Sequence, residues 1–560
     1  MFLAMKRHAG PSILLIALLF LSMFAYSPKT TQAWASNRPE VPLMGNTLLF
    51  LPKATYLGPA SSTALTYITV TLAINTTGAE KYASTLYNGN SPNFRKFLTP
   101  EQFMAKFGPK QQALNSISTL LNALGFQISG VQFGDQFGFV TSIGAVESAF
   151  GVPISMYRYN GETFFANSQN PMVPSSVAPF IVAVDGLNNY TALATLTQNI
   201  QGFTTIIPAD VYSFYQFNSA FSSGANGNGR KIGIVGYPGQ GINLGDVTNF
   251  WTTYNIPWTS LTESTVNGGV PAVNTALGSG SMEMTLDAEW AGATGQEAGI
   301  TVMTDNPPWW WGQSQYTQWY NEMSQIVNSL NPDVMSTSIV FALTDLSSSQ
   351  ITSIHNLMVQ AVNQGITVVG ASGDKGSAVL YDPSSDPYVT AEGGVSDTLT
   401  ANTPGITGQT GWADSGGGPN TNFAQPSYQS SEKIKAPNNG YRDIPDISFP
   451  SAPSIALYFN GNWVGGYGGT SFAAPMFAGL VADTVTGVQT RVGLINNIMY
   501  DIPYGNAGCS YLGTSYSDVT IGNNGFNAGT GWDFVTGIGT PYAWNFIQAV
   551  DQWEYFPACR

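Results

Sequence analysis

The chain has 560 residues, which is too many for one ordinary hydrophobic core and predicts two or three folding units. Only 9% of its residues are charged, and an excess of acidic over basic residues gives a formal net charge of −14. Since no run of Lys and Arg is present to track phosphates or anionic lipid, nucleic acid and membrane surfaces are disfavoured as partners.

The first 35 residues have the three parts of a secretory signal. Residues 6–8 form the polar, basic start, residues 13–24 are apolar, and residues 33–35 (Ala-Trp-Ala) suit a cleavage site. We expect cleavage after Ala35 and a secreted, extracellular protein. An uncleaved membrane anchor is the alternative, but the apolar stretch is shorter than the roughly 20 residues that span a bilayer. No stable membrane insertion is expected after the signal is removed.

Residues 36–190 alternate strand-like and helical patterns and are predicted to form a small α/β unit. Within it, a helix is predicted to start at Thr99, because Pro100 suits the first turn and Gln102 is available for a capping interaction. A stretch rich in Thr and Asn, from residue 188 to 205, then separates this unit from the rest of the chain.

Beyond residue 205, short apolar runs alternate with helical patterns. This alternation predicts an α/β fold in which helices cover both faces of a parallel sheet. Functional residues of such sheets gather at the carboxyl ends of the strands, so we expect the site there. The strands are predicted to begin at Ile232, Ile300, Asp333 and Ile366, and the helices to span residues 281–292, 314–329, 348–364 and 472–484.

Residues 468–475 read GGTSFAAP and place Ser471 between small residues and an apolar helix. Its hydroxyl would lie at a helix N-terminus, where backbone N–H groups and the helix dipole favour the negative charge that develops in acyl transfer. Ser is also an ordinary helix N-cap, but the whole octapeptide is far more specific than a cap. We therefore interpret Ser471 as the nucleophile of a peptidase.

The same motif is shared by subtilisin-like peptidases, yet a Ser-His-Asp triad cannot easily be assembled here. His8 lies in the signal, and His355 lies in a helical pattern without the H-G-T surroundings of a subtilisin base. The first predicted strand ends in Gly236-Tyr237 where a subtilisin has aspartate. We expect a packing or surface role for His355, and a subtilisin that uses it is the alternative.

With imidazole excluded, carboxylates are the best candidates for the base. Glu283 and Asp287 are four residues apart and share one helix face, and the Met, Leu and Trp residues around them indicate burial. Two close buried carboxyls repel as dianions, so the pair should share one proton over a mildly acidic range. Glu283 could then accept the Ser471 proton while Asp287 orients it.

A third carboxyl, Asp374, directly follows the strand that begins at Ile366. If protonated, it could donate a hydrogen bond to the tetrahedral oxyanion, which requires acid or a strongly raised pKa. The alternative is a turn aspartate that bonds to backbone amides.

The octapeptide, the E-x-x-x-D helix and the SGD at Asp374 together resemble the sedolisins, the serine-carboxyl peptidases. The resemblance implies a subtilisin-like fold and a catalytic triad of Ser471, Glu283 and Asp287. It also implies that Asp374 stabilises the oxyanion.

The segment FRKFLTPEQFMAKFGP is similar to the activation prodomain of this family. The resemblance therefore implies a ferredoxin-like prodomain at residues 36–190, which inhibits the enzyme intramolecularly and is removed on maturation. Residues 191–205 would form the processing linker and residues 206–560 the peptidase domain.

Near the C-terminus, one loop region is similar to the calcium loop of the family. Two carboxylates and three backbone carbonyls would supply the hard oxygen ligands that Ca²⁺ prefers. A plain Gly/Asp turn is the alternative. The expected ligands of this one structural ion are Asp518, Val519, Gly529, Gly531 and Asp533.

The two cysteines of the chain, Cys509 and Cys559, lie on either side of this loop region. An oxidising exterior would allow them to form a disulfide, which closes a loop of about 50 residues and contributes roughly 4 kcal/mol in the chain-entropy model. Two free buried thiols are the alternative.

The chain departs from the family pattern at Ile339 and Val340, where many members have Trp-Gly, which affects the substrate pocket more than catalysis. We expect an acid-active endopeptidase that is made as a zymogen, acts on protein or peptide substrates and forms an acyl-enzyme. The alternatives are a tripeptidyl-peptidase of the same family and an exported binding protein without activity on the same scaffold. Aromatic residues at 309–311 could line a substrate cleft or pack as loop residues.

Overall fold

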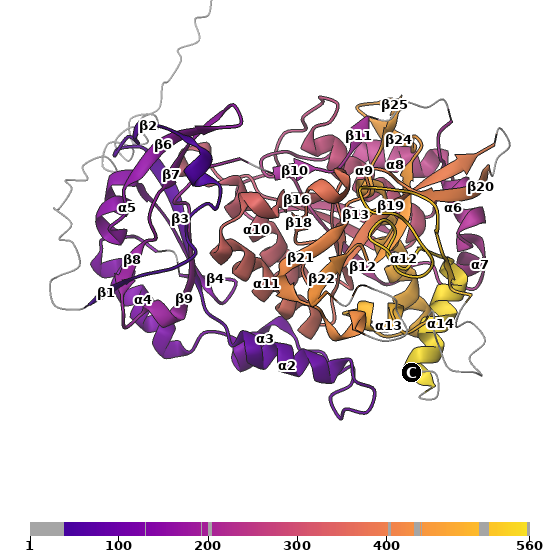
Figure 1. The fold of residues 1–560 in the computed structure, drawn as a ribbon, viewed down its shortest axis with the longest axis horizontal. Coiled ribbons are helices and arrows are strands. Elements are labelled where there is room, and N and C mark those ends of the chain that lie inside the picture. Colours follow the sequence, from indigo (N-terminus) through magenta and orange to yellow (C-terminus); the bar gives the residue numbers. More distant parts are fainter. Residues whose placement is uncertain are drawn as a thin grey trace, which may run out of the picture.

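The computed structural model describes residues 39–560 with the exception of residues 129, 192, 200–203, 401–404, 431–436, 438, 503–513 and 557–560. The expected signal, both cysteines and part of the expected linker lie outside the described residues. Figure 1 shows a smaller unit made by the N-terminal part of the chain beside a larger unit made by the rest.

The larger unit contains an eight-stranded sheet in the order β13-β14-β12-β15-β17-β19-β20, with β23 also paired to β19. All pairs are parallel except β19 with β20, which confirms the predicted α/β architecture. The strands are β12 (Lys231–Val235), β13 (Ser260–Thr265), β14 (Gly299–Thr304), β15 (Val334–Thr337), β17 (Thr367–Ala371), β19 (Thr390–Leu399), β20 (Ile406–Gly411) and β23 (Ile447–Ala452).

Helices cover both faces of this sheet. On one face α9 (Gly280–Thr294) and α12 (Thr470–Val488) pack against each other and against the central strands. On the other face lies α10 (Gln315–Gln325) with its π-helical continuation (Ile326–Leu330). The continuation packs so closely on Gly233 of β12 that a side chain at this position would collide with it. The helix α11 (Ser348–Asn363) also packs on the sheet, against β17.

The helix α12 forms the centre of the core. Among the described residues it alone is long and apolar enough to cross a membrane, but 89% of its apolar window is buried inside the protein. Its length and hydropathy therefore reflect its position in the core.

The strand predicted from Asp333 divides at Ser338. Residues Val334–Thr337 form β15 in the main sheet, whereas Ile339–Ala342 form β16, which leaves that sheet. There β16 pairs antiparallel with β10 (Leu193–Thr195) on one side and with β18 (Tyr381–Asp382) on the other. The division places Ser338 at the carboxyl end of a central strand.

The N-terminal unit has its own four-stranded antiparallel sheet in the order β4-β5-β3-β9. The helices α4 and α5 contribute to the apolar core beside it. A second antiparallel sheet, β2-β6-β7, adjoins it. The elements are β2 (Thr55–Pro59), β3 (Leu65–Leu72), α4 (Gln111–Ala123), β4 (Val131–Gln132), β5 (Gln136–Ser142), α5 (Ile143–Phe150), β6 (Ile154–Tyr159), β7 (Glu162–Asn167) and β9 (Ile181–Asp185).

The predicted helix start at Thr99 is confirmed: α3 (Pro100–Phe107) begins with a complete capping box between Thr99 and Gln102. This helix and α2 (Thr76–Leu86) do not cover the small sheet but pack toward α11 of the larger unit. Phe103 and Phe107 share a buried cluster with Val359 of α11.

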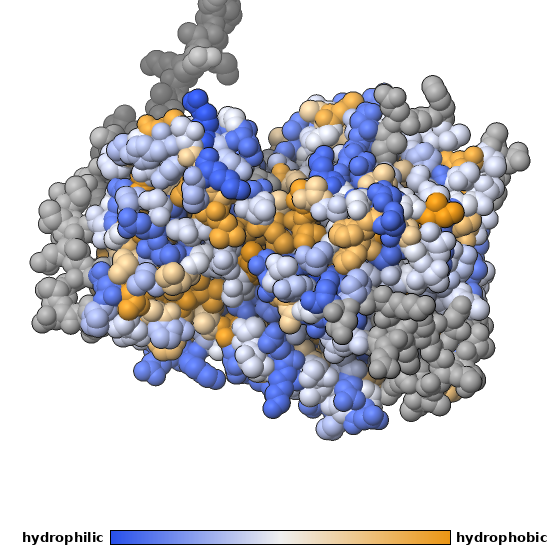
Figure 2. Space-filling view, in the orientation of Figure 1, coloured by the Kyte–Doolittle hydropathy of each residue, from blue (hydrophilic) through white to orange (hydrophobic). Residues whose placement is uncertain are grey.

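Polar and aromatic contacts extend the interface between the two units. Arg95 forms a largely buried ion pair with Glu554 of α14 (Ala543–Tyr555). The ring of Trp311 stacks on Tyr67 of β3 with centroids 5.5 Å apart, so the aromatic loop packs in part on the N-terminal unit. Figure 2 shows hydrophobic residues gathered near the middle of this face, between the two units.

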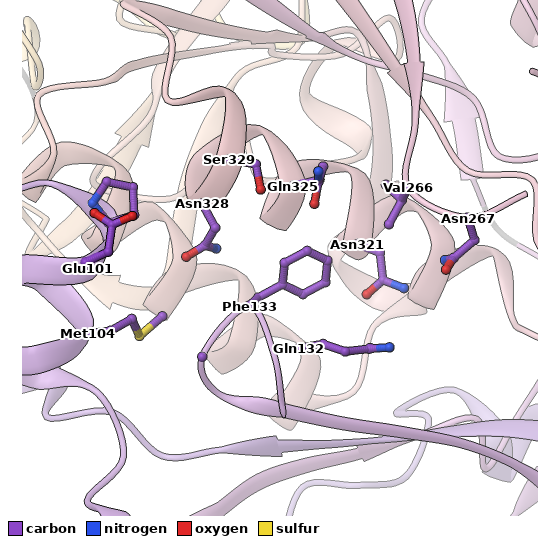
Figure 3. Close-up of a pocket in the computed structure, with 12 residues that line it drawn as sticks. Glu101, Met104, Gln132, Phe133, Val266, Asn267, Asn321, Gln325, Asn328 and Ser329 are labelled. Carbon is purple, nitrogen blue, oxygen red and sulfur yellow. The ribbon is translucent and has the colours of Figure 1, made fainter. Parts of the chain in front are cut away.

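A pocket also lies between the units, and side chains from both line it (Figure 3). Phe133, at the turn between β4 and β5, points into it, with Asn321 and Asn328 of the larger unit on either side. The lining of amide side chains shows that this part of the interface is polar.

Candidate active site

The four residues predicted to carry the chemistry come from three elements. Glu283 and Asp287 lie on α9, Ser471 is the second residue of α12, and Asp374 follows β17. All four are at most 2% exposed. Contacts described below join them into one cluster at the carboxyl ends of the central strands, where the sequence predicts the site.

Local sequence explains the two helix starts. Ser279 caps α9 by accepting a hydrogen bond from the N–H of Met282, which places Glu283 in the first turn. The chain enters α12 through Gly469, whose φ of 137° favours glycine. A side chain at Gly469 would also collide with the Leu196 carbonyl oxygen and with Asp374. Backbone conformation and lack of space therefore both require glycine here.

Glu283 lies beside the Ser471 hydroxyl. Burial raises the pKa of Glu283 to about 7, although Ser471, the Thr197 hydroxyl and the backbone of Leu196 each lower it. The hydroxyl and the carboxyl are close, but no hydrogen bond of good geometry joins them, and Ser471 Oγ and Glu283 Oε1 have no other partner. A short movement would let the hydroxyl donate its proton to Glu283.

Asp287 lies one helical turn further along α9, next to Glu283. Burial, and then the charge of Glu283, raise the pKa of Asp287 well above its usual value. The repulsion between the two carboxyls disfavours the state in which both are ionised. The charge of Glu283 thus affects the pKa of Asp287, as their i, i+4 spacing predicts.

Ser338 connects Asp287 to the nucleophile. Its hydroxyl donates to Asp287 Oδ1 at 2.6 Å and lies 3.3 Å from the backbone carbonyl oxygen of Ser471. That carbonyl lacks its usual helical partner, because the residue four positions later is Pro475, which has no N–H. The role of Ser338 was not predicted from the sequence, although Pro475 was a signal that the carbonyl needs another donor.

Asp374 is held by Thr470. Its Oδ1 accepts from the Thr470 N–H at 2.9 Å and from the Thr470 hydroxyl at 2.8 Å, while Oδ2 has no partner. Burial raises the pKa of Asp374 well above its usual value, the bonds from Thr470 lower it, and the charges of Glu283 and Asp414 raise it. A protonated Oδ2 is therefore free to donate a hydrogen bond.

The cluster contains buried polar atoms without a partner. Ser471 Oγ and one oxygen of each of the three carboxyls have no hydrogen-bond partner of good geometry. Each such atom costs about 1–3 kcal/mol of stability, which a purely structural network would avoid. Functional sites are the usual place for such a cost.

His355 does not take part in the cluster. Its Nδ1 pairs with Asp386 at 2.7 Å and its Nε2 with Glu80 of the N-terminal unit at 3.3 Å, while its ring stacks on Phe423. Both ring nitrogens are thus engaged by carboxylates away from Ser471. The expected packing role agrees with this placement.

The segment Leu193–Asn199 crosses the cluster, which no pattern in the sequence indicated. Thr197 Oγ1 donates to Glu283, and Gln198 Nε2 donates to the backbone carbonyl of Asp374. The Ser471 N–H donates to the Leu196 carbonyl oxygen at 3.3 Å. Downstream, β11 (Gln198–Asn199) pairs antiparallel with β26 (Tyr467–Gly468).

The five expected calcium ligands lie in one loop cluster. The Gly531 N–H donates to Asp518 and the Gly529 N–H donates to Asp533, both at 2.9 Å. The Val519 carbonyl lies 3.5 Å from the hydroxyl of Thr536, whose N–H donates to Asp533. Across the part of the chain that the structure describes, no group of three or more His, Cys, Asp or Glu side chains could hold a metal. The loop fits a hard cation only if backbone carbonyls supply most of the ligands.

Comparisons with known proteins agree with this geometry. Residues 52–190 match the family model "Pro-kumamolisin, activation domain". Kumamolisin of Bacillus sp. (strain MN-32) is 25% identical over 92% of this chain and 97% of its own length. Sedolisin of Pseudomonas sp. (strain 101) is 27% identical over 81% of each chain.

The chain resembles the sedolisin family. Its similarity to these relatives supports a serine-type peptidase. Tripeptidyl-peptidase 1 of Macaca fascicularis is also similar, with 25% identity over 81% of this chain and 85% of its own length. The match to the activation-domain model lies within the residues predicted as the prodomain.

The fold of this chain is also similar to a solved structure. Pseudomonas sedolisin, complexed with two molecules of pseudo-iodotyrostatin, superposes with a TM-score of 0.55 and 23% identity. The match covers 63% of this chain and all of that chain. It confirms the subtilisin-like α/β class of the larger unit.

Proposed function

We propose that this chain is the zymogen of a secreted, acid-active serine-carboxyl endopeptidase. The observation that carries the proposal is the cluster in which Ser471 meets a buried carboxyl, Glu283, and no histidine. Ser471 attacks the substrate carbonyl, Glu283 takes its proton, and Asp287 with Ser338 orients Glu283 and α12. The protonated Asp374 donates to the oxyanion, and the acyl-enzyme is then hydrolysed by water.

Acid activity follows from the protonation states that this scheme needs. Burial is the largest cause of the raised pKa at all three carboxyls, and residues 193–199 contribute to that burial. Once this segment leaves, water reaches the site and the pKa values fall toward their ordinary range. An ionised Glu283 beside a protonated Asp374 then requires an acidic medium.

Endopeptidase action is supported by how the chain fills the cleft. Three residues before Leu196 pair with β16 and two after Thr197 pair with β26. The cleft therefore accepts a strand that continues at least four residues before the Leu196–Thr197 bond. A tripeptidyl-peptidase must instead close its cleft three residues before the bond that it cuts.

The experiment that tests the proposed function is a pH–activity profile on a denatured protein substrate, followed by mass spectrometry of the products. We expect cleavage to peak well below pH 7 and to yield internal fragments of varied length. A series of tripeptides would identify the exopeptidase instead, and no cleavage at any pH would identify a binding protein without activity.

Asp374→Asn is expected to extend activity toward higher pH. The amide oxygen can still accept both bonds from Thr470, and the amide nitrogen can donate to the oxyanion without a titrating proton. We expect a loss of about 10–100-fold at the wild-type optimum and a shallower decline on the alkaline side, measured as kcat/KM against pH. Asp374→Ala, which has no donor, is the matched control and should lose about 10²–10³-fold at every pH. An unchanged alkaline decline in Asp374→Asn would contradict the role of Asp374.

We also propose that one Ca²⁺ stabilises the loop around Asp518 and Asp533. Addition of Ca²⁺ to chelator-treated protein should raise the thermal midpoint by a few degrees, because an ion that binds only the folded state adds stability. Mg²⁺ should have less effect, since it demands tighter octahedral geometry. In Asp518→Asn the Ca²⁺-dependent shift should largely disappear. A midpoint that does not respond to Ca²⁺ would refute the site.

A further inference from the structure

We propose that the bond between Leu196 and Thr197 is the bond at which this chain first cleaves itself. The residues around this bond would then also indicate that the enzyme prefers a leucine-sized apolar side chain immediately before the bond that it cuts. This inference rests on the proposed function, and it adds the bond and the specificity.

The first step of the argument is the position of the Leu196 carbonyl. Its oxygen accepts the backbone N–H of Ser471, the residue that carries the nucleophile. The same oxygen lies against Gly469, next to the unpaired Oδ2 of Asp374. The proposed mechanism assigns Asp374 as a donor to the oxyanion, and the Ser471 N–H is a second donor beside it. The Leu196 carbonyl therefore occupies the place of a carbonyl under attack.

The second step concerns the leaving group. The Thr197 hydroxyl donates to Glu283, and Glu283 also lies beside the Ser471 hydroxyl. The carboxyl therefore stands between the attacking oxygen and the residue whose nitrogen must leave. One carboxyl can take the proton from Ser471 and deliver it to the Thr197 nitrogen.

The third step is the register of the strands on either side. Before the bond, Leu193, Ala194 and Thr195 pair with Phe341, Val340 and Ile339 in that order. After the bond, Gln198 and Asn199 pair with Gly468 and Tyr467. An extended peptide fixed by backbone pairing on both sides cannot slide by one residue without losing both ladders.

The fourth step is the difference in burial along the segment. Leu196 is 3% exposed and belongs to the main apolar cluster of the larger unit, whereas its neighbours are half-buried and Asn199 is exposed. The cleft thus encloses one side chain of the segment, and that side chain is apolar. A substrate residue in the same position should be leucine-sized and apolar.

The reaction is a balanced hydrolysis within one chain. Ser471 Oγ bonds to the Leu196 carbonyl carbon as its proton passes to Glu283. The bond from that carbon to the Thr197 nitrogen then breaks, and the nitrogen takes the proton from Glu283. Water next attacks the Leu196 ester, gives one proton to Glu283 and leaves a Leu196 carboxyl, while Ser471 regains its proton.

The test is a time course of the purified full chain after transfer to acid, with N-terminal and mass analysis of the earliest fragments. We expect a first new N-terminus at Thr197 and a rate that does not depend on protein concentration. Leu196→Asp should slow this first cut by about 10²-fold. Asn199→Ala, at an exposed position of the same segment, should leave the rate within about twofold.

A separate probe keeps this inference distinct from the proposed function. A synthetic peptide with the sequence of residues 191–200, TALATLTQNI, should be cut by the processed enzyme between its second Leu and the following Thr. A processed chain that digests denatured protein, but has a different first N-terminus or cuts this peptide elsewhere, would overturn the inference alone. A chain that digests nothing would overturn the proposed function as well.

Discussion

Glu283→Gln is expected to lower peptide hydrolysis at least 10³-fold at every pH between about 3 and 8 and to leave the chain unprocessed. A glutamine has nearly the same shape and can still accept the Thr197 hydroxyl, but its amide cannot take the proton from Ser471. General acid–base catalysis contributes about 10²–10⁴-fold to the rate. Because the nucleophile and its base act as a unit, removing one of them also removes much of the contribution of the other. Appearance of the processed fragment on gels and hydrolysis of a fluorogenic peptide measure the loss.

Glu289→Gln is the matched control for this substitution. Glu289 lies on the same helix, is fully buried, and accepts the backbone N–H of Tyr458. This replacement makes the same chemical change on the same helix but leaves the residues around Ser471 unchanged. Activity should therefore stay within a few-fold of the wild type. Activity of Glu283→Gln within tenfold of the wild type would exclude Glu283 as the base.

In the proposed mechanism, the opposite protonation demands on Glu283 and Asp374 make a histidine unnecessary. Glu283 must lose its proton to act as a base, whereas Asp374 must keep its proton to act as a donor. The structure separates them by environment: Glu283 receives bonds that stabilise its ionised form, and Asp374 Oδ2 receives none. Two carboxyls can thus perform both roles at one pH.

The residues of the candidate site were predictable because short motifs fix them locally. The i, i+4 spacing on α9 and the glycine-rich entry to α12 determine side-chain direction within one or two turns. The division at Ser338 was not predicted, because the polar residues Ser336, Thr337 and Ser338 can also continue a buried strand. Only tertiary pairing of β16 with β10 and β18 separates it from β15.

The path of Leu193–Asn199 was not predictable for a similar reason. This segment is short and rich in Thr, and its partners lie about 85 to 275 residues away along the chain. The position of the aromatic loop was not predictable either, because the stacking of Trp311 on Tyr67 depends on how the two units meet. Sequence patterns report local periodicity, and these contacts depend on the assembled fold.

Stability of the unprocessed chain is expected to be highest in acid and to fall by several kcal/mol as the pH rises from about 4 to about 8. Burial raises the pKa of many carboxyls above their usual values. Among the described residues, Glu101, which is exposed, is the carboxyl whose pKa is clearly lowered. In the part of the chain that the structure describes, the carboxyls with a pKa near 7 or 8 are Asp135, Asp185, Glu283, Asp305, Asp382 and Asp397.

The sign follows from proton binding. Below a pH of about 4 such a carboxyl is protonated in both the folded and the unfolded chain, and its contribution is intact. Between about 4 and 7 the unfolded chain releases the proton while the folded chain keeps it, so the free energy of unfolding falls by up to about 1.4 kcal/mol per pH unit for each group. Above the folded pKa the contribution is fully lost.

Asp483→Asn isolates one such group. Asp483 is fully buried in α12, neither of its oxygens has a hydrogen-bond partner, and burial alone raises its pKa well above the usual value. An amide there cannot titrate, so the variant should match the parent in acid and exceed it in thermal midpoint at pH 8. Both should carry Ser471→Ala, which prevents self-cleavage during scanning calorimetry. A parent midpoint that rises from pH 4 to pH 8, or a variant with the same pH dependence, would show that buried carboxyls do not control stability. The preference of stability for acid thus comes from burial, whereas that of catalysis comes from the ordinary carboxyl pKa values that return once residues 193–199 leave the site.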